Sequence, residues 1–248
     1  MNFKKLGVLT AALLVVLNGC APAASGVLSL SPLPVPERRE DPRPSGKPVT
    51  LSVVPAESEV RYRIREQLVT LPLPNEVVGI TKEATGTVAL AGDGGIDLER
   101  SKIVIDLRNL KTDRIQRDRY VQREVLNTAQ FQTATFAPRE VKGITGGLPT
   151  SGEFLIEVTG DFTVKDQTKV VLWQGTARFE DKGVMVNLKL PTSFAEMGLT
   201  KPSVAILLSV EDDFQLEADL KLVKVVDAGS SVDGRPIPQD PRQSLPGY

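Results

Sequence analysis

Between Thr50 and Val226, apolar side chains recur at every second position of the chain. Val60, Tyr62 and Ile64 alternate with three arginines, which places apolar groups on one face of an extended strand and cations on the other. The same alternation returns in four further stretches, at 103–107, 154–164, 184–190 and 214–222. The sequence therefore predicts an all-β domain of about eight strands, each with one apolar face.

Short polar connections separate several of these strands. The strings AGDGG at 91–95, KDQT at 165–168 and EDKG at 180–183 are rich in Gly, Asp and Lys. Such loops are typical of β-hairpins and are too short for the crossovers that parallel strands need. We therefore expect an antiparallel sheet.

One segment departs from the alternation. Residues 112–127, TDRIQRDRYVQREVLN, contain no Gly or Pro, and Thr112 or Asp113 is a candidate N-cap. A helix here would share four apolar residues along one side: Ile115, Val121, Val125 and Leu126. We expect a short helix or helical loop, which serves either as a lid over one mouth of the sheet or as a crossover that plugs the core.

The same segment carries four arginines, at positions 114, 117, 119 and 123. Their clustering suggests a phosphate contact. However, Asp113, Asp118 and Glu124 are interleaved with them and can neutralise them as ion pairs on a helix face. We favour this second interpretation.

Eight strands with one apolar face each can close as a two-sheet sandwich or as a single barrel, and the alternation does not distinguish the two. An eight-stranded barrel has room for one small ligand. Because the inward faces carry few polar groups, such a cavity would suit an apolar molecule. The alternative is an interior filled by its own side chains.

The N-terminus has the features of a bacterial lipoprotein signal. Lys4 and Lys5 precede an apolar stretch at 6–17 that is too short to span a bilayer, and Gly19 stands directly before Cys20. We expect Cys20 to be the lipid attachment site, so that the mature protein is held on a membrane in the periplasm or on the outer face of the cell membrane. An ordinary secretory signal cut near the string APAAS is the alternative, and it also exports the chain.

Composition divides the rest of the chain. We expect a signal peptide at 1–19, a flexible Pro-rich tether at 20–48, a globular domain at 49–226 and a disordered tail at 227–248. The single cysteine and the lack of histidine exclude a Ser-His-Asp triad and histidine-ligated metals, so we expect no metal site and no enzyme cofactor. A formal net charge of −1 argues against a nucleic-acid partner.

Several motifs in a fixed order resemble the YceI-like, polyisoprenoid-binding family of bacterial periplasmic proteins. SEVRYRI at 58–64, GTVAL at 86–90 and KIVIDLRNLKT at 102–112 are followed by RDRYVQREVLNTAQFQTATF at 117–136 and by the hairpin TGDFTVKDQTKVVLW at 159–173. FAEMGL at 194–199 and FQLEADLKLV at 214–223 fall where the family has its closing strands.

This resemblance implies a single antiparallel lipocalin-like barrel that holds a long isoprenoid chain. From strand parity we expect Tyr62, Ile103, Ile105, Phe136, Phe154, Ile156, Trp173, Phe179 and Val186 to line it, although for Trp173 we favour core packing over ligand contact. The expected function is a lipid-anchored, non-catalytic binding protein for an isoprenoid such as a quinone or a polyprenyl phosphate. The alternative is a structural or interaction lipoprotein with a filled barrel.

Overall fold

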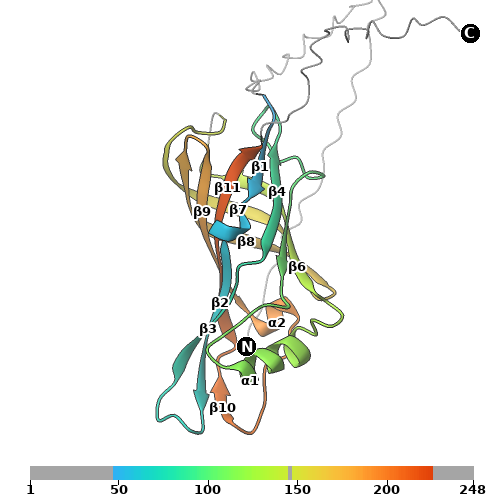
Figure 1. Ribbon diagram of the computed structural model, residues 1–248, viewed down its shortest axis with the longest axis vertical. Helices are drawn as coiled ribbons and strands as arrows, with labels where there is room; N and C mark the ends of the chain where they lie inside the picture. The colour runs from blue at the N-terminus through green and yellow to red at the C-terminus, as the bar shows by residue number, and fades with distance from the viewer. Residues whose placement is uncertain (1–46, 145–146, 226–248) are drawn as a thin grey trace, which may run out of the picture. The chain divides into compact units, whose positions relative to one another are not determined.

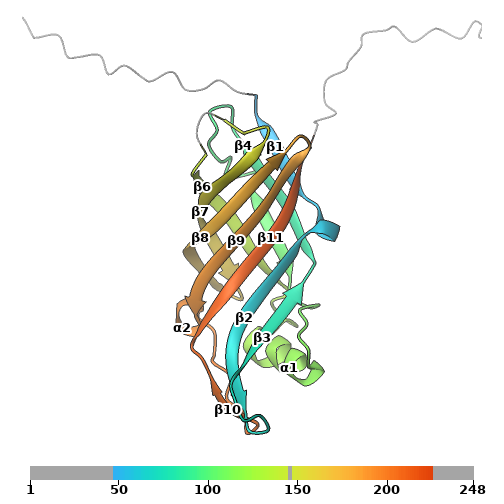
Figure 2. The ribbon, with the colours of Figure 1, turned by 90° about the vertical axis from the view of Figure 1, so that its left-hand side faces the viewer.

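The computed structural model describes residues 47–144 and 147–225. In this part of the chain, eight antiparallel strands close a barrel, because β1 (Val49–Val53) pairs with β11 (Asp213–Val225) as well as with β4 (Ala84–Leu90). Figure 2 shows the strands of one wall side by side and tilted. Around the barrel the strands are β1 (Val49–Val53), β4 (Ala84–Leu90), β5 (Lys102–Asp106), β6 (Thr133–Lys142), β7 (Gly152–Val164), β8 (Gln167–Glu180), β9 (Gly183–Ser193) and β11 (Asp213–Val225).

Three more strands extend the wall at one end. They are β2 (Glu59–Leu68), β3 (Asn75–Thr81) and β10 (Leu207–Val210). A short 3₁₀ turn, η1 (Pro55–Glu57), separates β1 from β2, and both strands pair with β11 along its length. The predicted all-β antiparallel barrel is thus confirmed, and the sandwich alternative is wrong.

The expected hairpins are also present. Val164 pairs with Gln167 and Glu180 with Gly183, which leaves two-residue loops between the paired strands. Lys165, the first residue of one loop, has φ 55°, as the first position of such tight hairpin turns requires. Four predicted features lie outside the described residues: the signal peptide, Cys20, most of the tether and the tail.

Residues 112–127 contain the expected helix. It comprises α1 (Ile115–Tyr120) and a π-helical turn, η2 (Val121–Val125). The cap prediction was wrong, since Arg114 occupies the N-cap and no side chain caps the helix. The predicted apolar side holds in part: Val125 and Leu126 are buried, but Ile115 is 59% exposed because the wider π turn shifts the helical phase.

A second helical turn, α2 (Phe194–Met197), stands where a closing strand was expected. Ser193 caps it by accepting a hydrogen bond from the backbone amide of Glu196 at 3.2 Å. Gly198 ends it with φ 66°, a conformation that favours glycine. This turn leads the chain away from β9; β10 then pairs with β2, and β11 returns to the barrel beside β9.

Cations and anions pair on the outer face of β2 and β11, as the alternation predicted. Arg61 Nε and Arg63 Nε lie 2.7 and 3.0 Å from Glu217 Oε2. The apolar positions of the same strands therefore turn inward. In the described ranges no helix is both long and apolar enough to cross a membrane.

Candidate functional site: the barrel interior

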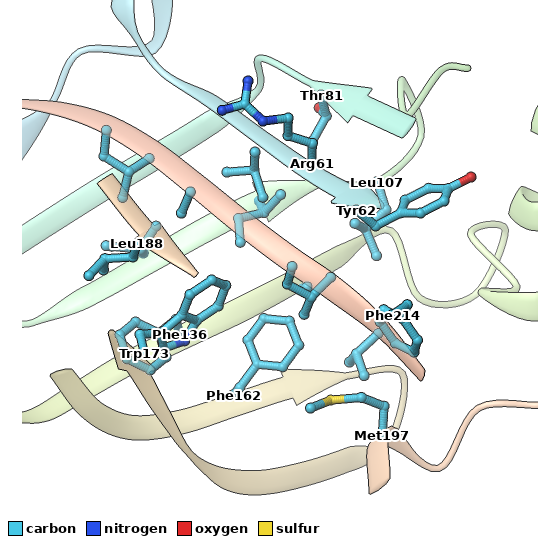
Figure 3. A pocket seen from close by; sticks show the side chains of 18 of the residues that line it. Arg61, Tyr62, Thr81, Leu107, Phe136, Phe162, Trp173, Leu188, Met197 and Phe214 are labelled. Atoms are coloured by element: carbon cyan, nitrogen blue, oxygen red, sulfur yellow. The ribbon is translucent and has the colours of Figure 1, made fainter. Parts of the chain in front are cut away.

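A cavity of about 840 Å³ occupies the barrel (Figure 3). Its wall consists mainly of the inward apolar faces of β2, β5, β6, β7, β8, β9 and β11. This volume is in the range of known small-molecule pockets. The interior is therefore not filled by the chain's own side chains.

Eight of the nine residues predicted from strand parity lie on this wall: Tyr62, Ile103, Ile105, Phe136, Ile156, Trp173, Phe179 and Val186. Phe154 is the exception. It lies at the start of β7 and packs edge-on against Phe179, with ring centroids 5.8 Å apart. Phe154 is thus partly buried against the core and does not line the cavity.

Three aromatic side chains form a group in one wall of the cavity. Phe136 and Phe162 each pack edge-on against Trp173, with centroid distances of 6.1 and 6.3 Å. Such pairs add about 0.5–1.5 kcal/mol beyond the area that they bury. Trp173 is only 4% exposed, so it is a packing residue that also forms part of the wall.

Tyr62 extends along the cavity away from this aromatic group, with its hydroxyl outermost (Figure 3). Its ring lies over Gly79, the residue opposite it on β3, and a Cβ at that position would clash with the ring. Burial raises the pKa of the Tyr62 phenol well above its ordinary value, with Arg117 opposing the shift. The hydroxyl is therefore a neutral hydrogen-bond donor.

The segment containing α1 covers one end of the cavity and adds polar groups to it. Glu66 from β2 and Arg114, Gln116 and Arg117 from this segment line this end. Arg117 Nη2 donates to Glu66 Oε1 at 2.6 Å, and both side chains are nearly buried. This ion pair fixes α1 to the barrel wall.

Exposed apolar side chains surround the same end. Val204 and Ile206 line the cavity yet are 37% and 50% exposed, and Leu208 in β10 is also exposed. The β2–β3 hairpin carries two more, Val69 and Leu73. Figures 1 and 2 place this hairpin and β10 at the α1 end of the barrel. The mouth is thus apolar outside and polar just within.

The comparisons with known proteins agree with this geometry. A family model described as "YceI-like domain" matches residues 51–222, which is more than half of the chain. The chain belongs to the YceI-like domain family. A search of curated proteins gave no match.

Two solved structures similar to this YceI-like domain are a polyisoprenoid binding domain from Saccharophagus degradans and BcnA from Burkholderia cenocepacia. The first is 16% identical, covers 71% of this chain and 98% of its own, and has a TM-score of 0.57. The second is 19% identical, covers 68% and 98%, and has a TM-score of 0.50. At these identities the likeness shows a shared fold.

Sequence reasoning missed several residues of the YceI-like cavity. Glu66 shares the inward parity of Val60, Tyr62 and Ile64, so a carboxylate on an apolar strand face was a signal that could have identified it. The sequence did not distinguish Arg117 from the other three arginines of its segment. Only the fold brings it to Glu66, 51 residues away in the chain.

Proposed function

We propose that this protein is an exported, lipid-anchored binding protein that holds an isoprenoid-type lipid, a quinone or a polyprenyl phosphate, inside its barrel. The observation that carries the proposal is the unfilled apolar cavity within the barrel. A prenyl chain that leaves water for such a cavity gains about 0.8 kcal/mol for each buried CH₂-sized unit. The printed description of the Saccharophagus degradans domain as polyisoprenoid binding supports this ligand class.

The cavity disfavours the alternative of a filled structural barrel. A barrel that serves only as a scaffold gains stability from close packing, since each void forfeits contacts. Here more than thirty apolar residues surround open space instead. Retaining such a space is useful only if something else fills it.

We propose no catalysis. The YceI-like polyisoprenoid-binding fold is a binding-protein fold. Carboxylates of the described strands are used mainly on the outer face, as in the pairs of Glu217 with Arg61 and Arg63. In the described ranges, no three Asp, Glu, His or Cys side chains lie close enough to hold a metal ion.

The proposed anchor keeps the barrel close to the membrane that stores the lipid. The tether at 20–48 would reach about 90 Å if extended, at ~3.1 Å per residue. A strand of 14 residues such as β8 spans only about 46 Å at ~3.3 Å per residue. The tether therefore lets the domain turn its apolar α1 mouth towards the bilayer.

A fractionation experiment tests the anchor. In the host, Cys20→Ser should move the protein from the membrane fraction to the soluble fraction after export, because the acylated cysteine is lost. Circular dichroism of the purified variant should match that of the native protein. A Cys20→Ser protein that stays fully in the membrane fraction would contradict the anchor.

The emission of Trp173, the only tryptophan in the chain, tests binding. Titrating detergent-solubilised protein with a long-chain prenol should change this emission saturably, since the indole forms part of the cavity wall. A linear prenol of only two isoprene units controls for nonspecific effects and should give a much weaker change. An emission spectrum that no prenol or prenylquinone alters would contradict the proposed function.

A further inference from the structure

Two segments protrude beyond the barrel at the α1 end (Figures 1 and 2). The loop 69–74, VTLPLP, joins β2 to β3, and the segment 202–208, PSVAILL, leads into β10. The backbone amide of Val69 donates to the carbonyl of Ile206 at 3.0 Å, and β10 pairs with the end of β2, so the two segments lie side by side. We call them together the apolar tip.

The apolar tip gathers exposed aliphatic side chains. Of the eleven large apolar residues that are exposed in the described ranges, five belong to it, with exposed fractions from 37% to 72%: Val69, Leu73, Val204, Ile206 and Leu208. Neither segment contains a charged residue, although a quarter of the chain is charged. A soluble surface rarely concentrates apolar groups in this way unless it contacts a partner.

The backbone of the loop 69–74 has few free hydrogen-bond donors. Pro72 and Pro74 have no amide N–H. The amide of Leu71 donates back to the last residue of β2 at 3.0 Å, and that of Val69 is bonded as described above. Four of these six residues thus present no unpaired N–H, and unpaired N–H groups are what make a loop costly to place in lipid.

The charges behind the tip are close to balanced. Three ion pairs join side chains next to it: Arg63 with Glu76, Arg65 with Glu211, and Lys201 with Asp212. Arg119 and Arg123 on the helical segment form no ion pair within the described ranges, and neither do Glu124 and Asp213. Charge therefore gives no strong preference for an anionic or a cationic partner, and apolar contact determines what the tip binds.

The tip is continuous with the cavity. Val204 and Ile206 line the cavity and are also exposed, so the same side chains belong to the outer surface and to the cavity wall. β1, the first described strand, begins at the opposite end of the barrel (Figure 1). The proposed tether at 20–48 reaches about 90 Å when extended, roughly twice the length of β8, so an anchored domain can turn its tip to the membrane.

We infer that the apolar tip inserts into the surface of a phospholipid bilayer, so that the mouth of the cavity opens against the membrane. A protruding, uncharged loop suits a fluid bilayer, whose lipids rearrange around it, whereas a second protein would need a matching groove. The inference rests on the proposed function for what passes through the mouth. It adds a second membrane contact, made by the domain itself rather than by the acylated cysteine.

A fluorophore at the tip tests the insertion. In full-length protein from its host, Leu73→Cys is labelled with an environment-sensitive dye, and the native protein gives the labelling background of Cys20. Leu155→Cys is the matched control, since Leu155 is 80% exposed and lies near the start of β7, the strand end remote from α1. With phosphatidylcholine vesicles, the emission of the Leu73 label should shift to the blue and be quenched by spin-labelled lipid, while the Leu155 label does neither.

Two results of this labelling experiment contradict the bilayer contact. No response at Leu73, or an equal response at both positions, overturns the inference. A Leu73 label that responds to protein concentration without vesicles identifies a second copy of the chain as the occupant and overturns it as well.

Transfer of prenol separates the role of the tip from that of the cavity. Val69 and Leu73 do not line the cavity, so Val69→Ser with Leu73→Ser should leave prenol binding in detergent unchanged. Uptake of prenol from phosphatidylcholine vesicles should slow by at least about fivefold, because the mouth no longer meets the membrane. Leu155→Ser with Leu172→Ser, at exposed positions of the outer wall, is the control and should take up prenol at the native rate. Unchanged uptake in the tip variant overturns the inference, whereas a native protein that binds no prenol in detergent overturns the proposed function instead.

Discussion

Arg117 on α1 donates to Glu66 on β2 at 2.6 Å, and this contact joins two elements that are 51 residues apart in the chain. With side-chain exposures of 12% and 9%, the pair is largely shielded from water, so loss of one partner leaves a poorly compensated charge. Glu66→Gln should therefore lower the free energy of unfolding by about 1–3 kcal/mol, with Asp113 moderating the loss.

The same substitution should loosen α1 more than the barrel. Hydrogen exchange at 115–125 should become faster, while the strands β7 and β8 keep their protection. Glu124→Gln, at an exposed position of the same helical segment, is the matched control and should change neither quantity. Unchanged exchange in Glu66→Gln would show that the ion pair does not hold the helix in place.

Gly79 makes room for the ring of Tyr62. Its backbone conformation is open to any residue, so Gly79→Ala tests the steric contact alone. We expect a loss of about 1–3 kcal/mol in urea unfolding, because the ring must leave its position. In a Tyr62→Ala background the same substitution should cost almost nothing, and additive losses in this double-mutant cycle would contradict the contact.

Much of the barrel can be predicted from strand parity, but parity does not show how distant strands pair. Alternation along a strand fixes which side chains share a face, so Ile103, Ile105 and Ile156 were assigned to the interior from local sequence alone. Whether the strands close as a barrel depends on the pairing of β1 with β11, a contact between opposite ends of the domain. No local period encodes it, and only the family resemblance pointed to it.

The helical segment illustrates the second limit. Its helical character was evident from composition, but its phase was not, because the π turn at Val121–Val125 rotates the side chains that follow. Val125 and Leu126 at the end of this turn are buried, whereas Ile115 before it lies outside and Arg117 inside, so the apolar residues do not share one side as an unbroken helix predicts. Likewise, Phe154 shares the inward parity but lies near the start of β7, where it packs against Phe179 and does not line the cavity.

Glu217 makes the stability of the barrel depend on pH. Burial opposes its ionisation, but hydrogen bonds from Arg61, Arg63 and Gln215 outweigh burial and hold the pKa of Glu217 below its ordinary value of 4.5. The unfolded chain takes up the proton at the ordinary value, so this stabilisation is present above about pH 4.5 and is lost as the pH falls through the lower folded-state pKa.

Glu217→Gln should therefore be about 1–3 kcal/mol less stable than the native protein at pH 7. The gap should narrow steadily in urea unfolding series taken below about pH 4.5. Glu153→Gln, at an exposed position at the start of β7, serves as the control and should follow the native curve. A gap for Glu217→Gln that is independent of pH would contradict the ionised pair.

Val186 and Met185 are neighbours on β9 that face opposite sides of the barrel wall, so they form a matched pair. Val186→Phe adds volume inside the cavity and should weaken prenol binding at least about tenfold while leaving the protein folded, since Val186 is only half-buried. Met185→Phe adds volume on the outside and should bind prenol normally. Equal binding by both variants would place the lipid outside the barrel.

Native mass spectrometry of the full-length protein, purified from its own host in a mild detergent, tests the central claim most directly. We predict a reproducible bound species whose mass excess corresponds to one isoprenoid molecule per chain, with the isoprenoid identified after lipid extraction. The occupancy of this species should fall in Val186→Phe but not in Met185→Phe. A barrel that carries no isoprenoid from its host, and that stays empty when prenols and prenylquinones are supplied, would contradict it.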